Sequence, residues 1–279
     1  MNAAVPPVGG WQAHLELGYA EREGATRLIH SQRRGPLTVQ RPFYPEGPVC
    51  HTYLLHPPGG VVGSDELSLE VHSQTGAQVL ITTPGATKFY RSGGRLARFQ
   101  QCLRVDAGAS LEWFPQENIF FPGAEVEMRT DLYLCQGARF IGWEMQCLGR
   151  PVIQERFDQG HIHARTQVWI DGRRHLLEHF VCNGVDLQQA AAGLRQAPMQ
   201  ASLLIYPATP QLLESLQALL AEITPPEIQA GATCLDELLV VRALGQQTQP
   251  LLSLFSALWA ECRPQVLGRP ASTPRIWAT

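Results

Sequence analysis

The sequence has almost no lysine. Of its 22 basic residues only Lys88 is a lysine, and the rest are arginines. Lys88 lies in the stretch TTPGATKFYR, residues 82–91, whose glycine and threonines suggest a phosphate-binding loop. Such a loop follows G-x-x-x-x-G-K-[ST], with a glycine directly before the lysine and Ser or Thr directly after it. Here Thr87 precedes the lysine and Phe89 follows it. The sequence therefore excludes this class of nucleotide site.

Long apolar runs and a strong charge of either sign are also missing. No run approaches the roughly 20 apolar residues of a membrane helix, and residues 1–10 lack the features of a secretion signal. A net charge of −3 gives no basic surface for nucleic acid. The seven cysteines are odd in number and form no C-x-x-C pair, which is typical of reduced thiols. We therefore expect a cytoplasmic protein that binds neither membranes nor nucleic acid.

The first two thirds of the sequence has strand patterns. A hydrophobic content of 44% is typical of a globular protein. Short β-branched or alternating runs are separated by Gly and Pro turns, which leaves a sandwich, a barrel or a stacked-sheet solenoid open. No repeat period stands out. The fold prediction is mainly β: a large body of stacked, mostly antiparallel β-sheets over about residues 11–182. The expected strands include residues 37–40, 49–55, 68–72, 78–82 and 132–135.

The last third has helix patterns. Thr209-Pro210 offers an N-cap and a proline at the first helical position, before leucines at helical spacing. We predict two C-terminal α-helices, near residues 210–221 and 249–261. With a strand between them they form a mixed part over about residues 183–279. No linker separates this part from the β body, so we expect a single domain over residues 1–279.

One hairpin is predicted in detail. Asp171-Gly172 separates two alternating runs, residues 161–170 and 173–182, and this dipeptide favours a type I′ turn. The implied register pairs Ile170 with Arg173, His163 with Phe180 and His161 with Cys182. It places four potential ligands on one face of the hairpin: His161, His163, Glu178 and Cys182.

Imidazole and thiolate together suit Ni²⁺ or Zn²⁺, so one hypothesis is a β-barrel metalloenzyme that uses His161, His163 and Cys182. The alternative is a solvated face beside a packed cysteine. Cupin metalloenzymes have a glutamate shortly after H-x-H, and residues 164–170 contain no acid. The motifs G-x-S-x-G, H-E-x-x-H and G-x-G-x-x-G are also absent, which weighs against an enzyme.

The sequence contains several long and unusual strings: GPLTVQRPFYPEG from Gly35, CHTYLLHPPGGVVGSDEL from Cys50, LITTPGATKFYRS from Leu80, LEWFPQENIFFPGA from Leu111, RFIGWEMQCLGRP from Arg139 and LGRPASTPRIWAT at the C-terminus. These strings resemble the urease accessory protein UreD (UreH) family, and the resemblance runs from end to end. One departure is Ser64, where the family more often has glycine.

The resemblance implies a non-catalytic scaffold of stacked sheets with two helices. It implies binding to a UreF-like accessory protein, through it to a UreG-like GTPase, and docking on urease apoprotein. It also implies a nickel ion in transit and no tightly bound cofactor. The nucleotide site then belongs to the GTPase. The stretch around Lys88 becomes a structural turn or a docking surface, and the expected partner-binding residues are Lys88, Phe89, Tyr90, Arg91 and Trp277.

For the nickel route we expect oxygen ligands to matter more than the histidines. Carboxylates bind late first-row ions more weakly than imidazole or thiolate do, and weak binding allows release. Asp65 follows a flexible Gly-Ser turn, whereas Glu178 lies in the middle of a strand. The candidate route residues are Asp65, Glu178, Glu155, Glu144, His161, His163 and Cys182.

Overall fold

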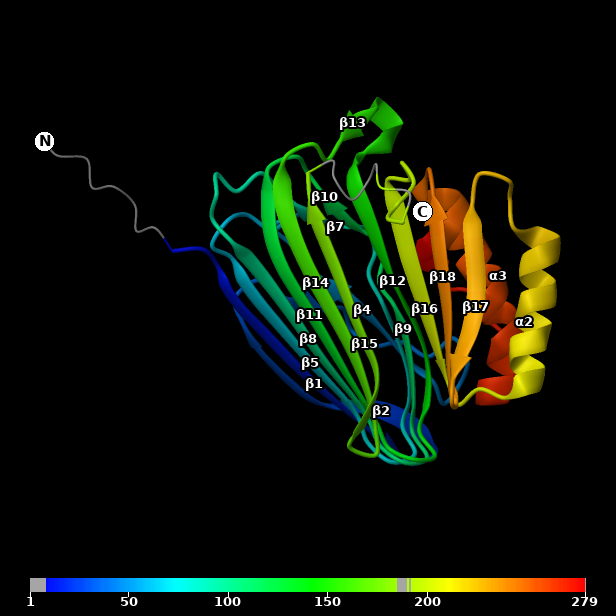
Figure 1. Cartoon of the computed structure of the whole chain (residues 1–279). Helices are drawn as coiled ribbons and strands as arrows, with labels where there is room; N and C mark the ends of the chain where they lie inside the picture. Colours follow the sequence, from blue (N-terminus) through cyan, green and yellow to red (C-terminus); the bar gives the residue numbers. More distant parts are fainter. Residues whose placement is uncertain (1–8, 185–189, 191, 279) are drawn as a thin grey trace, which may run out of the picture.

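The computed structural model describes residues 9–184, 190 and 192–278. Two β-sheets face each other, and two helices lie against the outer side of one of them (Figure 1). The first sheet has seven strands. In spatial order they are β15 (Arg173–Asn183), β14 (Gly160–Ile170), β11 (Ala124–Leu134), β8 (Ala97–Val105), β5 (Glu66–Ser73), β1 (Gln12–Arg22) and β2 (Ala25–Arg34).

The second sheet has eleven strands. Its main path is β17 (Gln229–Leu235), β18 (Leu238–Gly245), β16 (Met199–Tyr206), β12 (Arg139–Arg150), β9 (Ser110–Phe114), β6 (Gln78–Thr82), β4 (Cys50–Leu55) and β3 (Thr38–Val39). Three short strands join it off this path: β7 (Thr87–Phe89), β10 (Asn118–Phe120) and β13 (Glu155–Arg156). Short 3₁₀ helices span Pro151–Ile153 and Arg275–Ala278. The prediction of a mainly β protein is confirmed.

The expectation of mostly antiparallel strands is wrong for the centre of both sheets. Between β5 and β14 the long strands alternate between the two sheets, so successive coils of a β-solenoid stack in parallel. Antiparallel pairs lie towards the sheet ends, as in β1–β2, β14–β15 and β16–β18. The coils in the seven-stranded sheet begin at Glu66, Ala97, Ala124 and Gly160. These unequal intervals hide the repeat from a search for a fixed period.

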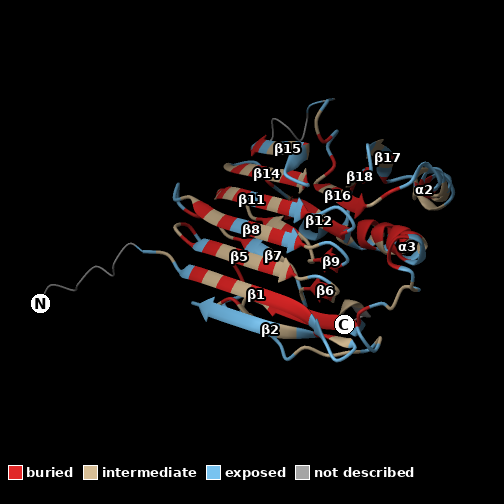
Figure 2. Ribbon diagram, turned by 90° about the horizontal axis from the view of Figure 1, so that it is seen from below, coloured by how far each residue is buried: buried red, intermediate tan, exposed pale blue. Residues whose placement is uncertain are grey.

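Two hydrophobic cores follow from the alternation of side chains along the strands. One core lies between the sheets, and the other lies between the eleven-stranded sheet and the helices. In β12, for example, Phe140 and Leu148 belong to the first core, whereas Ile141 and Trp143 belong to the second. Figure 2 shows the alternation as bands of buried and less buried residues along the strands of the seven-stranded sheet. The central strands of the eleven-stranded sheet are therefore covered on both faces.

Both predicted helices are confirmed. Helix α2 spans Pro210–Ile223, and the Thr209 side chain accepts a hydrogen bond from the Leu212 amide at 3.2 Å, as an N-cap does. Helix α3 spans Thr248–Leu267 and runs past the predicted end at residue 261. It ends where Gly268 adopts a left-handed conformation, with φ 69°. In the part of the chain that the structure describes, neither helix combines the length and apolarity of a membrane span.

The predicted hairpin turn is confirmed, but its register is not. Asp171 and Gly172 both have positive φ, as a type I′ turn requires, and Ile170 pairs with Arg173. A β-bulge follows, because Trp169 pairs with Arg174 while Val168 pairs with Leu176. One extra residue on β15 shifts every later pair and exchanges the faces of that strand. As a result His163 pairs with Val181, and His161 pairs with Asn183.

A buried ion-pair network ties α3 to the eleven-stranded sheet. The Arg263 guanidinium is fully buried and donates to Glu112 at 2.9 Å and to Glu46 at 2.6 Å. Burial would raise the pKa of Glu46, but hydrogen bonds from His51 and Arg263 outweigh it and lower this pKa to about 2. Burial raises the pKa of Glu112 despite its bonds to Arg263 and Trp259. One cation thus serves two carboxylates, and the more exposed Glu46 ionises first.

Candidate functional site

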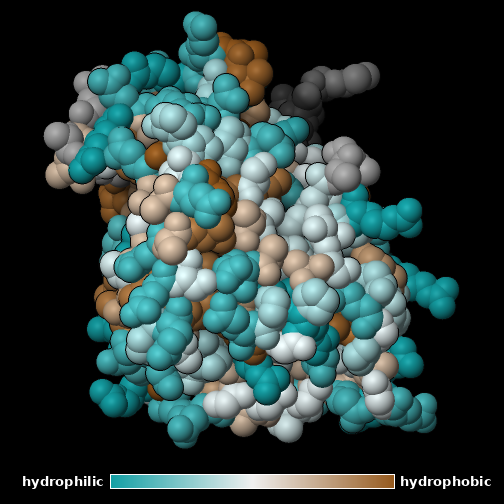
Figure 3. Space-filling view, turned by 90° about the vertical axis from the view of Figure 1, so that its right-hand side faces the viewer, coloured by the Kyte–Doolittle hydropathy of each residue, from teal (hydrophilic) through white to brown (hydrophobic). Residues whose placement is uncertain are grey.

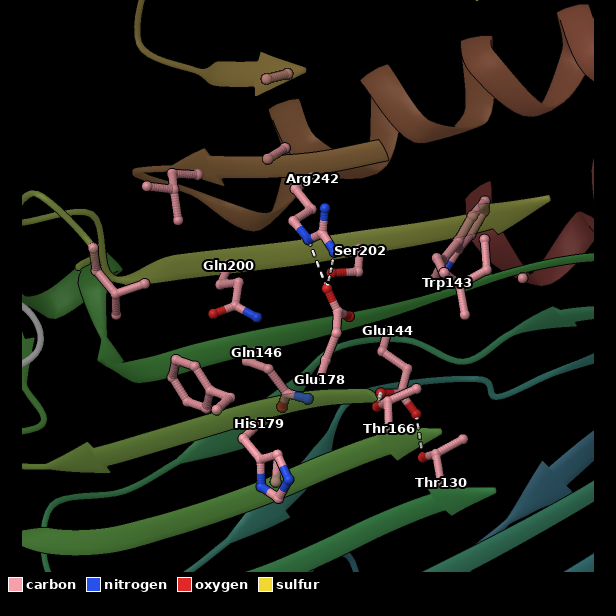
Figure 4. Close-up of a pocket in the computed structure, with 18 of the residues that line it drawn as sticks. Thr130, Trp143, Glu144, Gln146, Thr166, Glu178, His179, Gln200, Ser202 and Arg242 are labelled. Atoms are coloured by element: carbon pink, nitrogen blue, oxygen red, sulfur yellow. Dashed lines mark hydrogen bonds and ion pairs between the residues drawn. The ribbon is translucent and has the colours of Figure 1, made fainter. Parts of the chain in front are cut away.

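A cavity of about 800 Å³ lies between the two sheets. Strands β11, β14 and β15 line it on one side, and β12, β16 and β18 line it on the other (Figure 4). Most residues between the sheets form the apolar core, but polar side chains gather at this end. A cavity with a few convergent polar groups is where a binding site is expected in a protein of this kind.

The seven-stranded sheet contributes one polar row. Register partners on four neighbouring strands, β8, β11, β14 and β15, are all polar, and they are Gln101, Thr130, Thr166 and Glu178. The same row continues into β5 and β1 as Leu69 and Leu15, which are buried in the apolar core. The row is therefore polar only towards the cavity.

The eleven-stranded sheet contributes a second polar row. Glu144 on β12 pairs in register with Ser202 on β16, and Ser202 pairs with Arg242 on β18. The two rows face each other across the gap between the sheets (Figure 4). Together they are called the polar seam: Gln101, Thr130, Thr166, Glu178, Glu144, Ser202 and Arg242.

Glu144 is the innermost charge of the seam. Its carboxylate accepts hydrogen bonds from Thr130 Oγ1 at 2.5 Å, Thr166 Oγ1 at 3.2 Å and Gln101 Nε2 at 3.4 Å. All three donors are neutral, and no ion pair among the described residues involves Glu144. Burial raises the pKa of Glu144, and the negative charge of Glu178 adds to that rise. Protein surrounds this carboxylate, yet the side chain remains partly accessible from the cavity.

Glu178 joins the two sheets at the open side of the cavity. Arg242 Nε donates to Glu178 Oε1 at 2.6 Å, and Arg242 Nη2 also contacts this oxygen. The Arg242 side chain is 49% exposed and the Glu178 side chain 26% exposed. Glu178 therefore lies in the same row as the groups that donate to Glu144, while its own charge is paired with Arg242 at the rim of the cavity.

Two residues that line the cavity also carry a buried polar atom without a protein partner in the described part of the chain. Gln146 Oε1 and Trp113 Nε1 are buried and have no hydrogen-bond partner among the described residues. Oxygen atoms predominate in the seam, so it would hold a divalent cation weakly.

Two of the expected route residues, Asp65 and Glu155, lie elsewhere. Asp65 is buried and accepts hydrogen bonds from the backbone amides of Trp11 at 2.7 Å and Val62 at 2.8 Å. It anchors the turn that contains Ser64, whose φ of 74° explains why glycine suits that position. Glu155 forms a two-bond ion pair with Arg150 on the surface. Neither carboxylate lines the cavity.

The expected cluster of His161, His163 and Cys182 does not form. His161 bonds Asn183, and His163 Nε2 lies 3.3 Å from His179 Nδ1. Cys182 is buried in the core between the sheets, where its thiol donates to the Gly184 carbonyl at 3.4 Å. The bulge separates the thiol from the histidines by moving it to the other face. Within the described residues no group of three His, Cys, Asp or Glu side chains could hold a metal ion.

The expected partner-binding residues divide by exposure. Phe89 is fully buried and stacks on Phe120, so its side chain cannot reach a partner. Lys88 and Arg91 are exposed, and Tyr90 is half-buried. Trp277 donates to Thr82 Oγ1 at 3.0 Å and so lies over the start of the same stretch. Figure 3 looks onto the side of the molecule where the helices lie, and hydrophobic residues form a broken strip there.

Sequence reasoning missed most of the polar seam. A signal existed, because Thr130 interrupts the buried apolar positions of β11, between Met128 and Leu132. Gln101 interrupts β8 in the same way. Such interruptions are visible in the sequence, but the register that aligns them between strands is not. In the sequence, Arg242 looks like an ordinary surface residue of an apolar strand.

Comparison with known proteins finds close similarity along the whole chain. The family model described as UreD urease accessory protein matches residues 12–278. A protein named urease accessory protein UreD from Escherichia coli is 48% identical over 273 residues, covering 97% of this chain and 98% of its own. Proteins of the same name from Aliivibrio fischeri (strain MJ11) and Klebsiella pneumoniae are 47% and 44% identical, over 278 and 279 residues. They cover 97% and 100% of this chain, and 97% and 99% of their own.

Proposed function

The chain belongs to the UreD family of urease accessory proteins, and we propose that nickel ions pass through its cavity along the polar seam on their way to urease. As a member of this family it is a non-catalytic maturation protein, involved in assembling the nickel metallocentre of urease. Nickel is here a cargo, which must be bound and then released.

The observation that carries the proposal is the environment of Glu144. Glu144 is half-buried, and a carboxylate that is largely shielded from water normally has a cationic partner, because an unpaired charge in such a place is costly. Glu144 has only neutral donors and faces the cavity. A divalent cation beside it would supply the missing positive charge. Because the nearby ligands are oxygens, the ion would be held weakly enough to leave.

We further propose that the chain acts in a cytoplasmic complex with a UreF-like protein, a UreG-like GTPase and urease apoprotein. The absence of a phosphate-binding loop around Lys88 fits a division of labour in which the GTPase binds the nucleotide. Lys88, Tyr90, Arg91 and Trp277 are the residues proposed for contact with a partner. Arginine tolerates partial burial at interfaces and pairs with carboxylates by two bonds, which suits an arginine-rich chain.

The test is to replace Glu144 by glutamine and to co-express the variant with the other maturation proteins and urease. We expect a normal yield of complex and at least a fivefold drop in nickel bound per urease at limiting nickel. Glu155→Gln is the matched control, because it removes a carboxylate that is paired on the surface. A Glu144→Gln variant that loads urease fully would contradict the proposed route. A loss of complex yield would instead indicate a folding role.

A further inference from the structure

Arg242 is positioned to compete with a metal ion for Glu178. Its guanidinium lies on the one carboxylate of the seam that has an ion-pair partner, and it reaches that carboxylate from the opposite sheet. Figure 4 shows the Arg242 and Glu178 side chains meeting across the gap, beside Ser202. A cation that approaches Glu178 from solvent must therefore displace the guanidinium or share the carboxylate with it.

This pair has the properties of an exchangeable contact. Arg242 is half exposed on a long side chain, so it can move into water without leaving a buried charge behind. Half-exposed ion pairs contribute little to stability, in contrast to buried ones. Glu178 lies in the middle of β15 opposite Thr166, and the paired strands fix its position. The arginine is thus the mobile partner and the glutamate the fixed one.

We propose that Arg242 is a tethered competitor that sets how tightly the seam holds a divalent cation. In the absence of metal the guanidinium neutralises Glu178. A divalent ion with twice its charge takes its place, and the arginine returns as the ion moves on, which favours release. The inference rests on the proposed nickel passage and adds to it the residue that determines affinity at its rim.

Electrostatics predicts the direction of the effect. Without Arg242, the seam carries Glu144 and Glu178 with no cation bonded to either among the described residues. The negative potential at the rim then rises, and divalent cations bind more tightly and leave more slowly. A chain that must pass its cargo on is impaired by tighter binding. Removal of a positive charge should therefore increase nickel binding and decrease nickel delivery.

The experiment measures both quantities on the full-length chain. Calorimetric titration with Ni²⁺ should give a dissociation constant roughly threefold to tenfold lower for Arg242→Gln than for the wild type, as expected for a half-exposed charge. Urease loading in the complex should be slower by a similar factor. Arg242→Lys keeps the charge but cannot reproduce the guanidinium geometry. Its dissociation constant and its loading rate should therefore lie between those of the wild type and those of Arg242→Gln.

The matched control is Arg129→Gln. Arg129 pairs with Glu127 on the outer face of the seven-stranded sheet, and its side chain is 44% exposed, close to the 49% of Arg242. Arg129→Gln should leave both the dissociation constant for Ni²⁺ and the rate of urease loading unchanged. A wild-type dissociation constant in Arg242→Gln would overturn the proposal, as would an equal change in Arg129→Gln. If Arg242→Gln does not fold, a wild-type constant in Arg242→Lys would overturn it instead.

If the proposed nickel passage itself is wrong, the measurements will differ from those expected if only the role of Arg242 is wrong. If nickel does not use the seam, Glu144→Gln and Glu178→Gln will both load urease normally. If the passage is real but Arg242 does not compete, these two variants will be defective while Arg242→Gln behaves as the wild type. The two failures are therefore distinguishable in one set of measurements.

Discussion

Glu112 is a buried carboxylate and Glu144 a half-buried one; they lie on opposite faces of the same sheet, and their surroundings differ. Glu112 on β9 is 2% exposed, faces the helices, and is bonded to the Arg263 guanidinium and the Trp259 indole. Glu144 on β12 faces the other sheet, is bonded only to neutral donors and is accessible from a cavity. Burial raises the pKa of both.

We propose that this difference separates a structural charge from a functional one. A buried carboxylate with a two-bond arginine partner is already satisfied, and removing either partner leaves an uncompensated charge. A carboxylate held by hydroxyl and amide groups keeps a negative potential that an incoming cation can use. We therefore assign Glu112 to the attachment of α3 and Glu144 to the site. Each of the following predictions tests one side of that assignment.

The largest effect is expected at Arg263. Arg263→Met should lower the free energy of unfolding by about 3–5 kcal/mol, because it leaves Glu112 and Glu46 without their shared cation. Denaturant unfolding measures the change. Arg150→Gln is the control, since it removes an arginine from an exposed pair with Glu155 and should cost about 1 kcal/mol or less. Equal effects of the two variants would show that the buried network does not anchor the helix.

A somewhat smaller effect is expected from Glu46, and it depends on pH. The pKa of Glu46 is lowered in the folded protein to about 2 from an ordinary value of 4.5. The stability that it contributes is therefore present above about pH 4.5 and is lost as the pH falls towards 2. At neutral pH this contribution is of the order of 2–3 kcal/mol. Glu46→Gln should be less stable than the wild type at pH 7, and the difference should shrink as the pH falls from 5 to 2.5. A difference that does not change with pH would contradict the ion-pair explanation.

The next effect, that of Glu144→Gln on the free energy of unfolding, is smaller and has the opposite sign. The pKa of Glu144 is raised, so folding favours its protonated form, and its contribution to stability is greatest at low pH and is lost as the pH rises through the raised pKa. Glutamine resembles the protonated form. Glu144→Gln should therefore be as stable as the wild type at pH 7, or more stable by up to about 1 kcal/mol. Thermal unfolding at pH 5 and pH 7 checks this, and a large destabilisation at pH 7 would move Glu144 to the structural class.

The sequence predicts some of these regions better than others. Local signals identified the helices, the hairpin turn and the Thr209 cap, since each depends on residues close together in the chain. The predicted strand direction was wrong, because the alternation of side chains within one strand does not reveal which strand lies beside it. The polar seam depends on register between strands that are mostly far apart in the chain, as between Gln101 and Thr130. Glu144 was proposed from chemistry, but only the fold distinguishes it from Glu112.

The hairpin shows how one residue alters a site prediction. The type I′ turn was correct, and simple counting from it placed Cys182 beside His161. The bulge after Val168 moved the thiol into the core and left the histidines on the outer face. A bulge makes the local register depend on packing against neighbouring strands as well as on the turn. The metal cluster predicted from the hairpin was wrong for this reason.

The smallest effect is expected for those histidines. His161 and His163 lie on the side of β14 that faces away from the polar seam, where His161 bonds Asn183 and His163 bonds His179. His161→Ala and His163→Ala should each change the free energy of unfolding by about 0.5 kcal/mol or less, as for other surface substitutions. Nickel bound per urease should stay within experimental error of the wild type, whereas Glu144→Gln measured in parallel should lower it. If the histidine variants abolish loading and Glu144→Gln does not, nickel follows the outer face of the seven-stranded sheet and the seam is only a polar interior. The contrast between the two faces of β14 then decides the route, because no variant in this set changes both.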